Sequence, residues 1–250
     1  MINLDLTETR YAKEHRELEL RGCFLYRNLL DEAAINQWSE KSKAAFESED
    51  TGMLRSRGSL YGSRSLLRVL PSVVELAHQC GLQQFIVEAL GSGWGVVRGL
   101  FFDKPPERSW TLPWHRDRTI AVAAHLNFEH FTNPTVKAGI PHVIAPQWLL
   151  ERMLTLRFHL DDVTHENGPL VILPGSHRCE LTDDELATSG EGLMLPIHCQ
   201  AGDVFVMRPL LAHTSLLSAP GTQRHRRVIH LELAPADILP APLKWHDFIA

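Results

Sequence analysis

The sequence predicts a mainly β protein with flanking α-helices, in which an antiparallel double-sheet barrel follows a helical N-terminal part. Helix-type patterns gather before about residue 93, whereas short apolar segments separated by Pro and Gly turns follow from Gly95 onward. The chain has 250 residues and a hydrophobic content of 44%, which is enough to bury one large core. No internal repeat or domain boundary stands out, so we expect a single domain over residues 1–250.

Three helices are expected in the N-terminal part, which extends over about 1–93. Asp31 can cap a helix over 31–49, where apolar residues recur at helical spacing. Segments 71–79 and 82–90 predict two further helices, the second followed by Gly91-Ser-Gly. This glycine group does not resemble a phosphate-binding loop, because Lys and Ser/Thr do not follow it in order. We interpret it as a helix cap.

The barrel is expected over about 94–235. Apolar runs bounded by turn residues predict strands at 96–102, 120–124, 154–160, 170–173, 204–207 and 228–233. Region 127–150 interrupts them with Pro and Gly residues and predicts an irregular insertion, either a substrate lid or a plain surface loop. A helix over 147–153 is expected at its end.

The first candidate metal ligands lie in His115-Arg116-Asp117. An imidazole and a carboxylate two residues apart share one face of an extended strand. The chain has 14 His, so one such triplet is weak evidence, and His159-Leu160-Asp161 has the same spacing. The second triplet continues a regularly alternating apolar strand, which favours an ordinary polar face. The first lies at a loop-to-strand junction, where a scaffold can direct ligands into a cavity.

A third ligand would be His213, in Pro209-Leu-Leu-Ala-His-Thr-Ser. With His115 and Asp117 it would provide two imidazoles and one carboxylate on one face of an octahedral ion. This arrangement is typical of non-haem Fe(II) sites, in which the opposite face stays open for oxygen and a co-substrate.

A wider resemblance rests on four blocks of sequence. They are Phe101-Phe-Asp-Lys-Pro-Pro with Pro113-Trp-His-Arg-Asp-Arg-Thr-Ile, Glu166-Asn-Gly-Pro-Leu-Val-Ile-Leu-Pro-Gly-Ser-His, Met207-Arg-Pro-Leu-Leu-Ala-His-Thr-Ser and His225-Arg-Arg-Val-Ile-His-Leu-Glu. In this order they resemble the phytanoyl-CoA dioxygenase family of Fe(II)/2-oxoglutarate-dependent oxygenases. The resemblance implies a double-stranded β-helix core, the jelly-roll or cupin-like fold, and Gly22-Cys-Phe-Leu-Tyr resembles the family's opening strand.

The resemblance also implies roles for particular residues. His115, Asp117 and His213 match the iron ligands, and an arginine beyond the distal histidine pairs with the far carboxylate of 2-oxoglutarate. The usual family spacing points to Arg224, whereas alignment of the following strand points to Arg226, which we prefer. The other expected positions are Ser215 at the co-substrate, Lys104 and Arg157 facing co-substrate or substrate, and Arg116, Trp114 and His177 near the substrate. A purely structural role is the alternative for these polar residues, and Arg224-His-Arg-Arg could be a basic surface patch.

Two positions of the ligand motif carry further information. Many family members have Gln between the ligating His and Asp, whereas this chain has Arg116. Strand alternation directs this side chain away from the metal, so ligation should be unaffected. Asp117 retains the carboxylate that halogenating relatives replace with a small residue. The resemblance therefore implies hydroxylation or a related oxidation.

The implied function is that of an Fe(II)/2-oxoglutarate-dependent dioxygenase, a hydroxylase. It would use O2, with ascorbate as a stimulant, to oxidise a C–H bond of a small or medium polar metabolite, and would release succinate and CO2. One alternative is a cupin-like metal enzyme without 2-oxoglutarate, against which Arg226 argues. The other is a non-catalytic jelly-roll binding protein, against which the complete ligand set argues. No motif specifies the substrate, the regiochemistry or the oligomeric state.

The composition limits which classes of partner the protein is expected to bind. The formal net charge of −5 argues against general attraction to nucleic acid or anionic membranes. A nucleic-acid demethylase of this superfamily would show a second arginine where the chain has Glu232. No apolar run reaches the roughly 18 residues that span a bilayer, and the N-terminus lacks a signal-peptide pattern. The four cysteines have no Cys-x-x-Cys spacing, so we expect free thiols, a cytoplasmic location and a small-molecule substrate.

Overall fold

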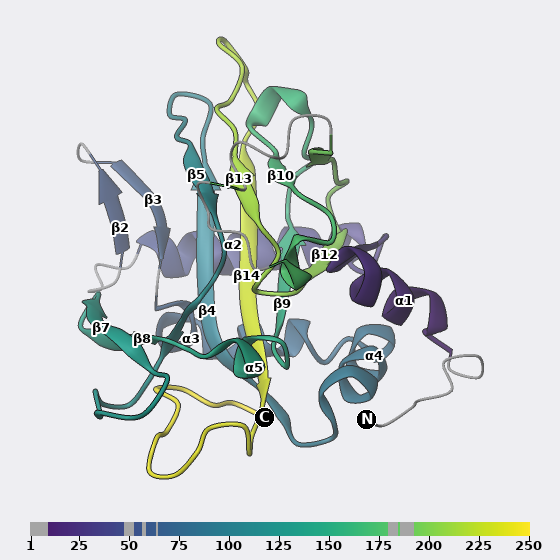
Figure 1. The fold of residues 1–250 in the computed structure, drawn as a ribbon. Coiled ribbons are helices and arrows are strands. Elements are labelled where there is room, and N and C mark those ends of the chain that lie inside the picture. Colours follow the sequence, from purple (N-terminus) through teal and green to yellow (C-terminus); the bar gives the residue numbers. More distant parts are fainter. Residues whose placement is uncertain (1–9, 48–52, 57–58, 64, 180–184, 186–192) are drawn as a thin grey trace.

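The largest element of the computed structural model is a seven-stranded antiparallel sheet (Figure 1). The structure describes residues 10–47, 53–56, 59–63, 65–179, 185 and 193–250. The sheet order is β1 (Cys23–Tyr26), β12 (Val204–Met207), β9 (Leu154–His159), β14 (Arg226–Pro235), β4 (Trp94–Lys104), β3 (Ser59–Ser63) and β2 (Met53–Ser56). β14 is ten residues long and pairs with both β4 and β9, so it lies at the centre of the sheet.

Two smaller antiparallel sheets complete the β structure. One has the order β11 (Leu195–Ile197), β10 (Leu170–Ile172), β13 (His213–Ser215) and β5 (Leu112–His115). The other has the order β6 (Thr119–Ala121), β8 (Ile140–Ile144) and β7 (Thr132–Lys137). The seven-stranded and four-stranded sheets are held together by a buried cluster that includes Leu170, Phe205 and Met207. The predicted mainly β class with two packed sheets is confirmed.

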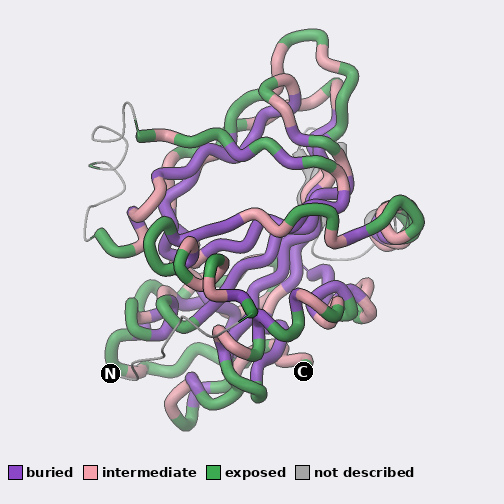
Figure 2. Tube along the Cα trace, turned by 90° about the vertical axis from the view of Figure 1, so that its right-hand side faces the viewer, coloured by how far each residue is buried: buried purple, intermediate pink, exposed green. Residues whose placement is uncertain are grey.

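Helices cover one face of the large sheet. They are α1 (Ala12–Arg21), α2 (Glu32–Glu47), α3 (Leu66–Val69), the 3₁₀ helix η1 (Pro71–Leu76) and α4 (Cys80–Leu90). The main core forms between these helices and the strands, because Leu154, Leu156 and Phe158 alternate toward the helices along β9. The intervening residues of β9 are buried on the other face, inside the barrel. Figure 2 shows the resulting pattern, with buried chain along the strands and exposed positions on the outer helices and loops.

Two predicted helix boundaries, the Asp31 cap and the glycine group after Leu90, agree with the structure, whereas the end predicted at residue 49 lies outside the described residues. The Asp31 side chain accepts a hydrogen bond from the amide of Ala34 at 2.8 Å, which places it as the cap of α2. Gly91 has a φ of 89° and donates its amide to Val87, so the glycine group ends α4. The helix predicted over 71–79 is instead the 3₁₀ helix η1. The helical N-terminal part also contributes three strands, of which only β1 was expected.

The prediction of an irregular insertion over region 127–150 was wrong, because this region is folded. It contains most of the three-stranded sheet and the short helix α5 (Gln147–Leu150), which ends before the predicted residue 153. Ala138 and Gly139 have φ of 53° and 79°, and Lys137 pairs with Ile140 across them. Two residues with positive φ form the tight turn that suits a β-hairpin. Gly139 therefore joins two strands, whereas the sequence suggested that it interrupts them.

The remaining segments support the barrel. 3₁₀ turns η2 (His165–Asn167) and η3 (Ser176–Arg178) flank β10, and the C-terminal segment returns to pair Ile249 with Val96. The four cysteines are all free thiols, as predicted. Among the described residues, no helix combines the length and apolar character that a membrane crossing requires.

Candidate active site

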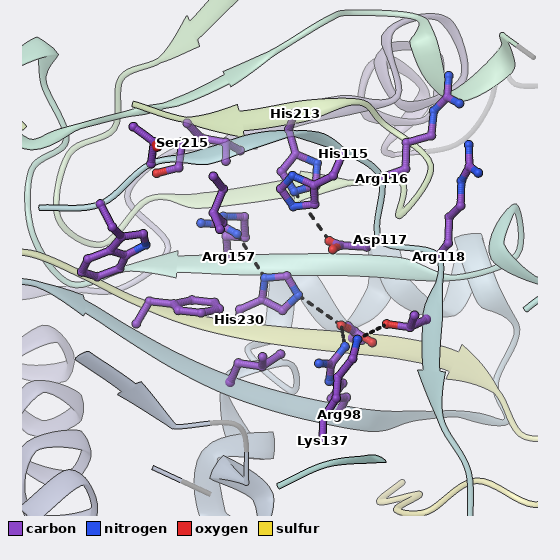
Figure 3. Close-up of a pocket in the computed structure, with 18 of the residues that line it drawn as sticks. Arg98, His115, Arg116, Asp117, Arg118, Lys137, Arg157, His213, Ser215 and His230 are labelled. Atoms are coloured by element: carbon purple, nitrogen blue, oxygen red, sulfur yellow. Dashed lines mark hydrogen bonds and ion pairs between the residues drawn. The ribbon is translucent and has the colours of Figure 1, made fainter. Parts of the chain in front are cut away.

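A cavity of about 690 Å³ lies between the large sheet and the four-stranded sheet. Its walls come from β4, β9 and β14 on one side and from β5, β10 and β13 on the other. Lys137 and Ile144, from the β7–β8 hairpin, close one end. Figure 3 shows charged and imidazole side chains from these elements pointing into the same space.

His115, Asp117 and His213 meet in this cavity. One donor atom from each lies within 4.8 Å of the other two, and no other such group of metal-binding side chains occurs among the described residues. His115 and His213 are directly opposite each other on β5 and β13, with ring centroids 4.2 Å apart. His213 Nε2 lies 3.8 Å from Asp117 Oδ2. The three side chains thus converge from one strand pair and the loop that follows it.

The hydrogen bonds of the two imidazoles leave the correct nitrogens available. His115 Nδ1 lies 2.7 Å from the Pro113 carbonyl oxygen, and His213 Nδ1 lies 2.8 Å from that of Leu211. A histidine that donates one N–H to a carbonyl presents its other nitrogen as a lone-pair donor, as metal-binding histidines do. Asp117 Oδ2 is buried and has no hydrogen-bond partner. This donor set fits a divalent transition metal, which would satisfy all three atoms.

The charge state of the triad also suits a cation. Burial opposes ionisation of Asp117, but its interactions with the rings of His213, His230 and His115 and with Arg98 outweigh burial and lower the pKa of the carboxyl. Burial is the main cause that lowers the pKa of His213. At neutral pH the site therefore holds a carboxylate and neutral imidazole, which are the protonation states that bind metal.

The local backbone differs from the prediction at Asp117. β5 ends at His115, so Asp117 lies in the loop before β6 instead of continuing the strand. Its amide donates to the Pro209 carbonyl at 2.9 Å, which fixes this loop against the segment leading to β13. Arg116 points away from the triad, as predicted, and donates to the carbonyls of Ser176 and Cys179 (Figure 3).

The second His-x-Asp triplet has a structural role. Asp161 accepts three hydrogen bonds from Arg227, at 2.6–2.9 Å, on the outside of the sheet. His159 is buried and does not line the cavity. The face that it shares with Arg157 is the interior of the barrel, so its interpretation as an ordinary polar face was wrong, and Arg157 itself lines the cavity.

Arg226 occupies the other side of the cavity. It is 4% exposed, lines the cavity, and donates to Ser215 Oγ at 3.3 Å. Its Nε has no hydrogen-bond partner, and neither has Nε of Arg157 nearby. Burial, and secondarily the charge of Arg157, lower the pKa of Arg226 to about 9, so the guanidinium remains charged at neutral pH. Two buried cations with unused donors form an incomplete site that an anionic group would complete.

Lys104 lies behind this site and not in its wall. Its Nζ donates to Ser215 Oγ at 3.1 Å and to the carbonyls of Trp110 and Leu216 at 2.9 and 2.7 Å. Burial, together with Arg226 and Arg157, lowers the pKa of this amine to about 6. Lys104 thus holds Ser215 and the adjacent backbone, which differs from the predicted direct contact with co-substrate or substrate.

Three predicted positions lie outside the cavity. Arg224 is half exposed and pairs with Glu166 at 2.8 Å. Trp114 packs against the buried pair Leu173 and Ala212. His177 lies instead in an adjoining hollow of about 260 Å³, which shares Arg116 and Arg118 with the main cavity.

The structure adds a buried polar chain that the sequence did not reveal. His230 Nδ1 lies 3.1 Å from Arg157 Nη1, and His230 Nε2 lies 3.5 Å from Glu232 Oε1. Arg98 from β4 donates to the same Glu232 oxygen at 3.0 Å. Figure 3 shows His230 between Arg157 and Arg98. The period-2 alternation from Arg226 along β14 could have found His230 and Glu232, but the cross-strand position of Arg98 needs the pairing of β14 with β4.

Solved structures share this fold. AviO1 from Streptomyces viridochromogenes Tue57 is 24% identical, with a TM-score of 0.64 over 92% of this chain and 97% of that one. EctD from S. alaskensis with 2-oxoglutarate and 5-hydroxyectoine is 16% identical, with a TM-score of 0.70 over 90% of this chain and 76% of that one. SnoN, a non-haem α-ketoglutarate-dependent epimerase from nogalamycin biosynthesis, is 17% identical, with a TM-score of 0.64 over 90% and 82%. These similarities confirm the jelly-roll fold.

The family assignment comes from the sequence itself. No curated protein matches the chain. Residues 19–225 match the family described as Phytanoyl-CoA dioxygenase (PhyH), and this range contains the triad, Ser215 and the strand pair that joins His115 to His213. The match covers most of the chain, in agreement with the four blocks of sequence and with the fold. The chain belongs to the phytanoyl-CoA dioxygenase family.

Proposed function

We propose that this protein is an Fe(II)/2-oxoglutarate-dependent dioxygenase that hydroxylates a C–H bond of a small-molecule metabolite. The observation that carries the proposal is the combination of two incomplete sites in one cavity. One is the triad of His115, Asp117 and His213, and the other is the buried guanidinium of Arg226. A metal site alone would serve many reactions, whereas the buried arginine calls for a carboxylate beside it.

In this proposal His115, Asp117 and His213 hold the iron. The carbonyls of Pro113 and Leu211 keep the two rings oriented, so that the other nitrogen of each ring is available to the iron, and Nε2 of His213 lies 3.8 Å from Asp117 Oδ2. Family membership and the bound 2-oxoglutarate of EctD support Fe(II) and 2-oxoglutarate as the cofactor and co-substrate. When bound together with O2, they supply an oxidation in which substrate, 2-oxoglutarate and O2 give hydroxylated substrate, succinate and CO2.

The other residues of the cavity bind and orient 2-oxoglutarate. The planar fork of Arg226 donates hydrogen bonds to the distal carboxylate of 2-oxoglutarate, the Ser215 hydroxyl adds another, and Arg157 adds a second positive charge. Lys104 positions Ser215 from behind. Apolar side chains such as Leu100, which also lines the cavity, limit access of water to the reacting groups.

Two features favour hydroxylation and the use of 2-oxoglutarate over the alternatives. Asp117 supplies the carboxylate ligand that halogenating members of the family replace. A cupin-like enzyme without 2-oxoglutarate would have no use for the unused donors of Arg226 inside the barrel. SnoN is an epimerase on the same fold, so the test must identify the product as well as the turnover.

The test measures succinate formation by anaerobically purified protein given Fe(II), ascorbate, 2-oxoglutarate and then O2, across a pool of small metabolites. Asp117→Ala should abolish hydroxylation and weaken Fe(II) binding, because one of three ligands is lost and only the two imidazoles remain. Asp237→Ala, at an exposed position outside the cavity, is the matched control. Product mass separates hydroxylation, which adds one oxygen atom, from epimerisation, which adds none. The proposal fails if Asp117→Ala binds Fe(II) as tightly as the control does.

A further inference from the structure

Arg157 reaches the cavity from β9 and lies beside both incomplete sites. Figure 3 shows it between Ser215, at the Arg226 end, and Asp117. Burial lowers the pKa of Arg157, and the charge of Asp117 opposes this shift. Burial, followed by the charge of Arg157, lowers the pKa of Arg226. Arg157 is therefore close to the anion-binding residues and to the metal-binding residues.

The direction of the Arg157 guanidinium depends on His230. Among the described residues, one hydrogen bond holds this side chain, from Arg157 Nη1 to His230 Nδ1 at 3.1 Å, and Nε has no partner. Arg226 carries a like charge beside it, which favours rotamers that take Arg157 away from Arg226. The acceptor on His230 opposes this repulsion.

The protonation of the His230 ring follows from the same bond. A guanidinium donates and does not accept, so Nδ1 accepts with its lone pair and the proton of the neutral ring lies on Nε2. Nε2 is 3.5 Å from Glu232 Oε1, and this oxygen accepts from Arg98 at 3.0 Å. His230 is directly opposite Arg157 in the strand pairing, and Glu232 is directly opposite Arg98. The register of β4, β14 and β9 thus presents His230 in the tautomer that can accept from Arg157.

We propose that His230 is a positioning residue, whose Nδ1 holds the Arg157 guanidinium beside Arg226, toward the distal carboxylate of 2-oxoglutarate. This inference rests on the proposed function, because it gives Arg157 a task in binding the co-substrate. His230 acts through Arg157 and is not itself a ligand of the metal.

His230 also packs against an aromatic ring, so the test must separate packing from hydrogen bonding. Phe102 meets it edge to face, with ring centroids 6.1 Å apart and an interplanar angle of 84°. His230→Phe keeps an aromatic ring and loses the acceptor. His230→Asn loses the ring but places an oxygen at the position of Nδ1. His230→Leu has nearly the shape of Asn without an acceptor, which makes it the matched variant.

The experiment is anaerobic calorimetric titration of the full Fe(II)-loaded chain with 2-oxoglutarate. His230→Phe and His230→Leu should raise Kd at least about fivefold, whereas His230→Asn should stay within about twofold of the wild type. A packing role predicts the reverse order, with Phe best tolerated. His142→Leu removes another buried histidine, one that does not line the cavity, and should leave Kd unchanged.

A double-mutant cycle tests whether His230 acts through Arg157. Arg157→Met should raise Kd in the wild type but change it less than about twofold in His230→Leu, because the guanidinium has already lost its position. Equal Kd values for the Leu and Asn variants, tighter binding by Phe than by Asn, or additive effects in the cycle would overturn the role of His230 alone. If the Fe(II)-loaded wild type does not bind 2-oxoglutarate, the proposed function falls together with this role, so the two failures are distinguishable.

Discussion

Replacing Arg226 with Gln should weaken 2-oxoglutarate binding by about 30- to 150-fold. The guanidinium is 4% exposed, so water does not screen its interaction with a carboxylate. Loss of one partner from such a buried pair costs about 2–5 kcal/mol. Arg157 remains in the cavity wall and keeps positive charge near the carboxylate, which places the expected loss at about 2–3 kcal/mol, and 1.4 kcal/mol corresponds to a factor of ten.

The matched variant is Arg224→Gln, because Arg224 is the other arginine that the sequence offered as the partner of the 2-oxoglutarate carboxylate. Arg224 is half exposed and pairs with Glu166, and an exposed pair of this kind contributes about 0–1 kcal/mol. Its removal should change 2-oxoglutarate affinity less than about twofold. Arg226→Lys keeps a charge but loses the planar fork, so about a tenfold loss is expected.

The assay is anaerobic calorimetric titration of the Fe(II)-loaded variants with 2-oxoglutarate. Thermal unfolding without 2-oxoglutarate gives the control for misfolding. Arg226→Gln removes a buried cation beside Arg157, so the variant should melt no lower than the wild type. The reasoning is refuted if Arg224→Gln causes the large loss and Arg226→Gln does not.

Three further predictions concern the surroundings of the site. Burial lowers the pKa of Lys104 to about 6, so above this pH the amine gives up a proton and with it one of its three donated hydrogen bonds. A bound dianion raises this pKa, so 2-oxoglutarate binding should take up protons and weaken as the pH rises above about 6. Titration heats in two buffers of different ionisation enthalpy measure this uptake, and identical heats would contradict it. Gly168→Ala should lower the free energy of unfolding by about 1–3 kcal/mol in urea denaturation, because φ is +67° and the new Cβ would meet the Leu216 carbonyl and Lys104 Nζ. Gly221→Ala, with φ +79° and no atom within 4 Å of a new Cβ, isolates the backbone contribution and should cost less. Arg116→Gln should keep Fe(II) affinity within about twofold, because the guanidinium lies away from the metal ligands. The variant loses the two hydrogen bonds to the Ser176 and Cys179 carbonyls, which should lower the free energy of unfolding by about 1–2 kcal/mol. A tenfold fall in Fe(II) affinity would show that Arg116 acts on the metal ligands.

Local periodicity predicted much of the fold and part of the site. Alternation along 226–233 is enough to place Arg226 and His230 on one face, and both line the cavity, because side-chain direction within a regular strand follows from the strand itself. At Asp117 the predicted direction is correct but its cause differs, because the strand ends two residues earlier and the hydrogen bond from the Asp117 amide to the Pro209 carbonyl holds the loop. The convergence of the triad was expected from the family resemblance, since spacing alone also allowed His159.

What the sequence could not provide depends on contacts between distant segments. Arg98 and Glu232 are 134 residues apart and meet only because β4 and β14 pair in one register. Region 127–150 was misjudged because Ala138 adopts a positive φ that this residue type rarely has. Neither fact follows from propensity, so the Arg98–Glu232 pair and the β7–β8 hairpin became visible only once the strands were assembled.

The central position of β14 has a consequence for how such an enzyme can diversify. Arg226, His230 and Glu232 belong to a strand that is hydrogen-bonded on both sides, so a change in its path would disturb β4 and β9 together. Arg118 and Lys137, by contrast, lie on a connecting loop and on the edge strand of the smallest sheet. β7 pairs with only one strand, β8. The residue proposed to bind 2-oxoglutarate thus lies on the strand whose path is most constrained, whereas this part of the cavity wall belongs to elements with fewer strand partners.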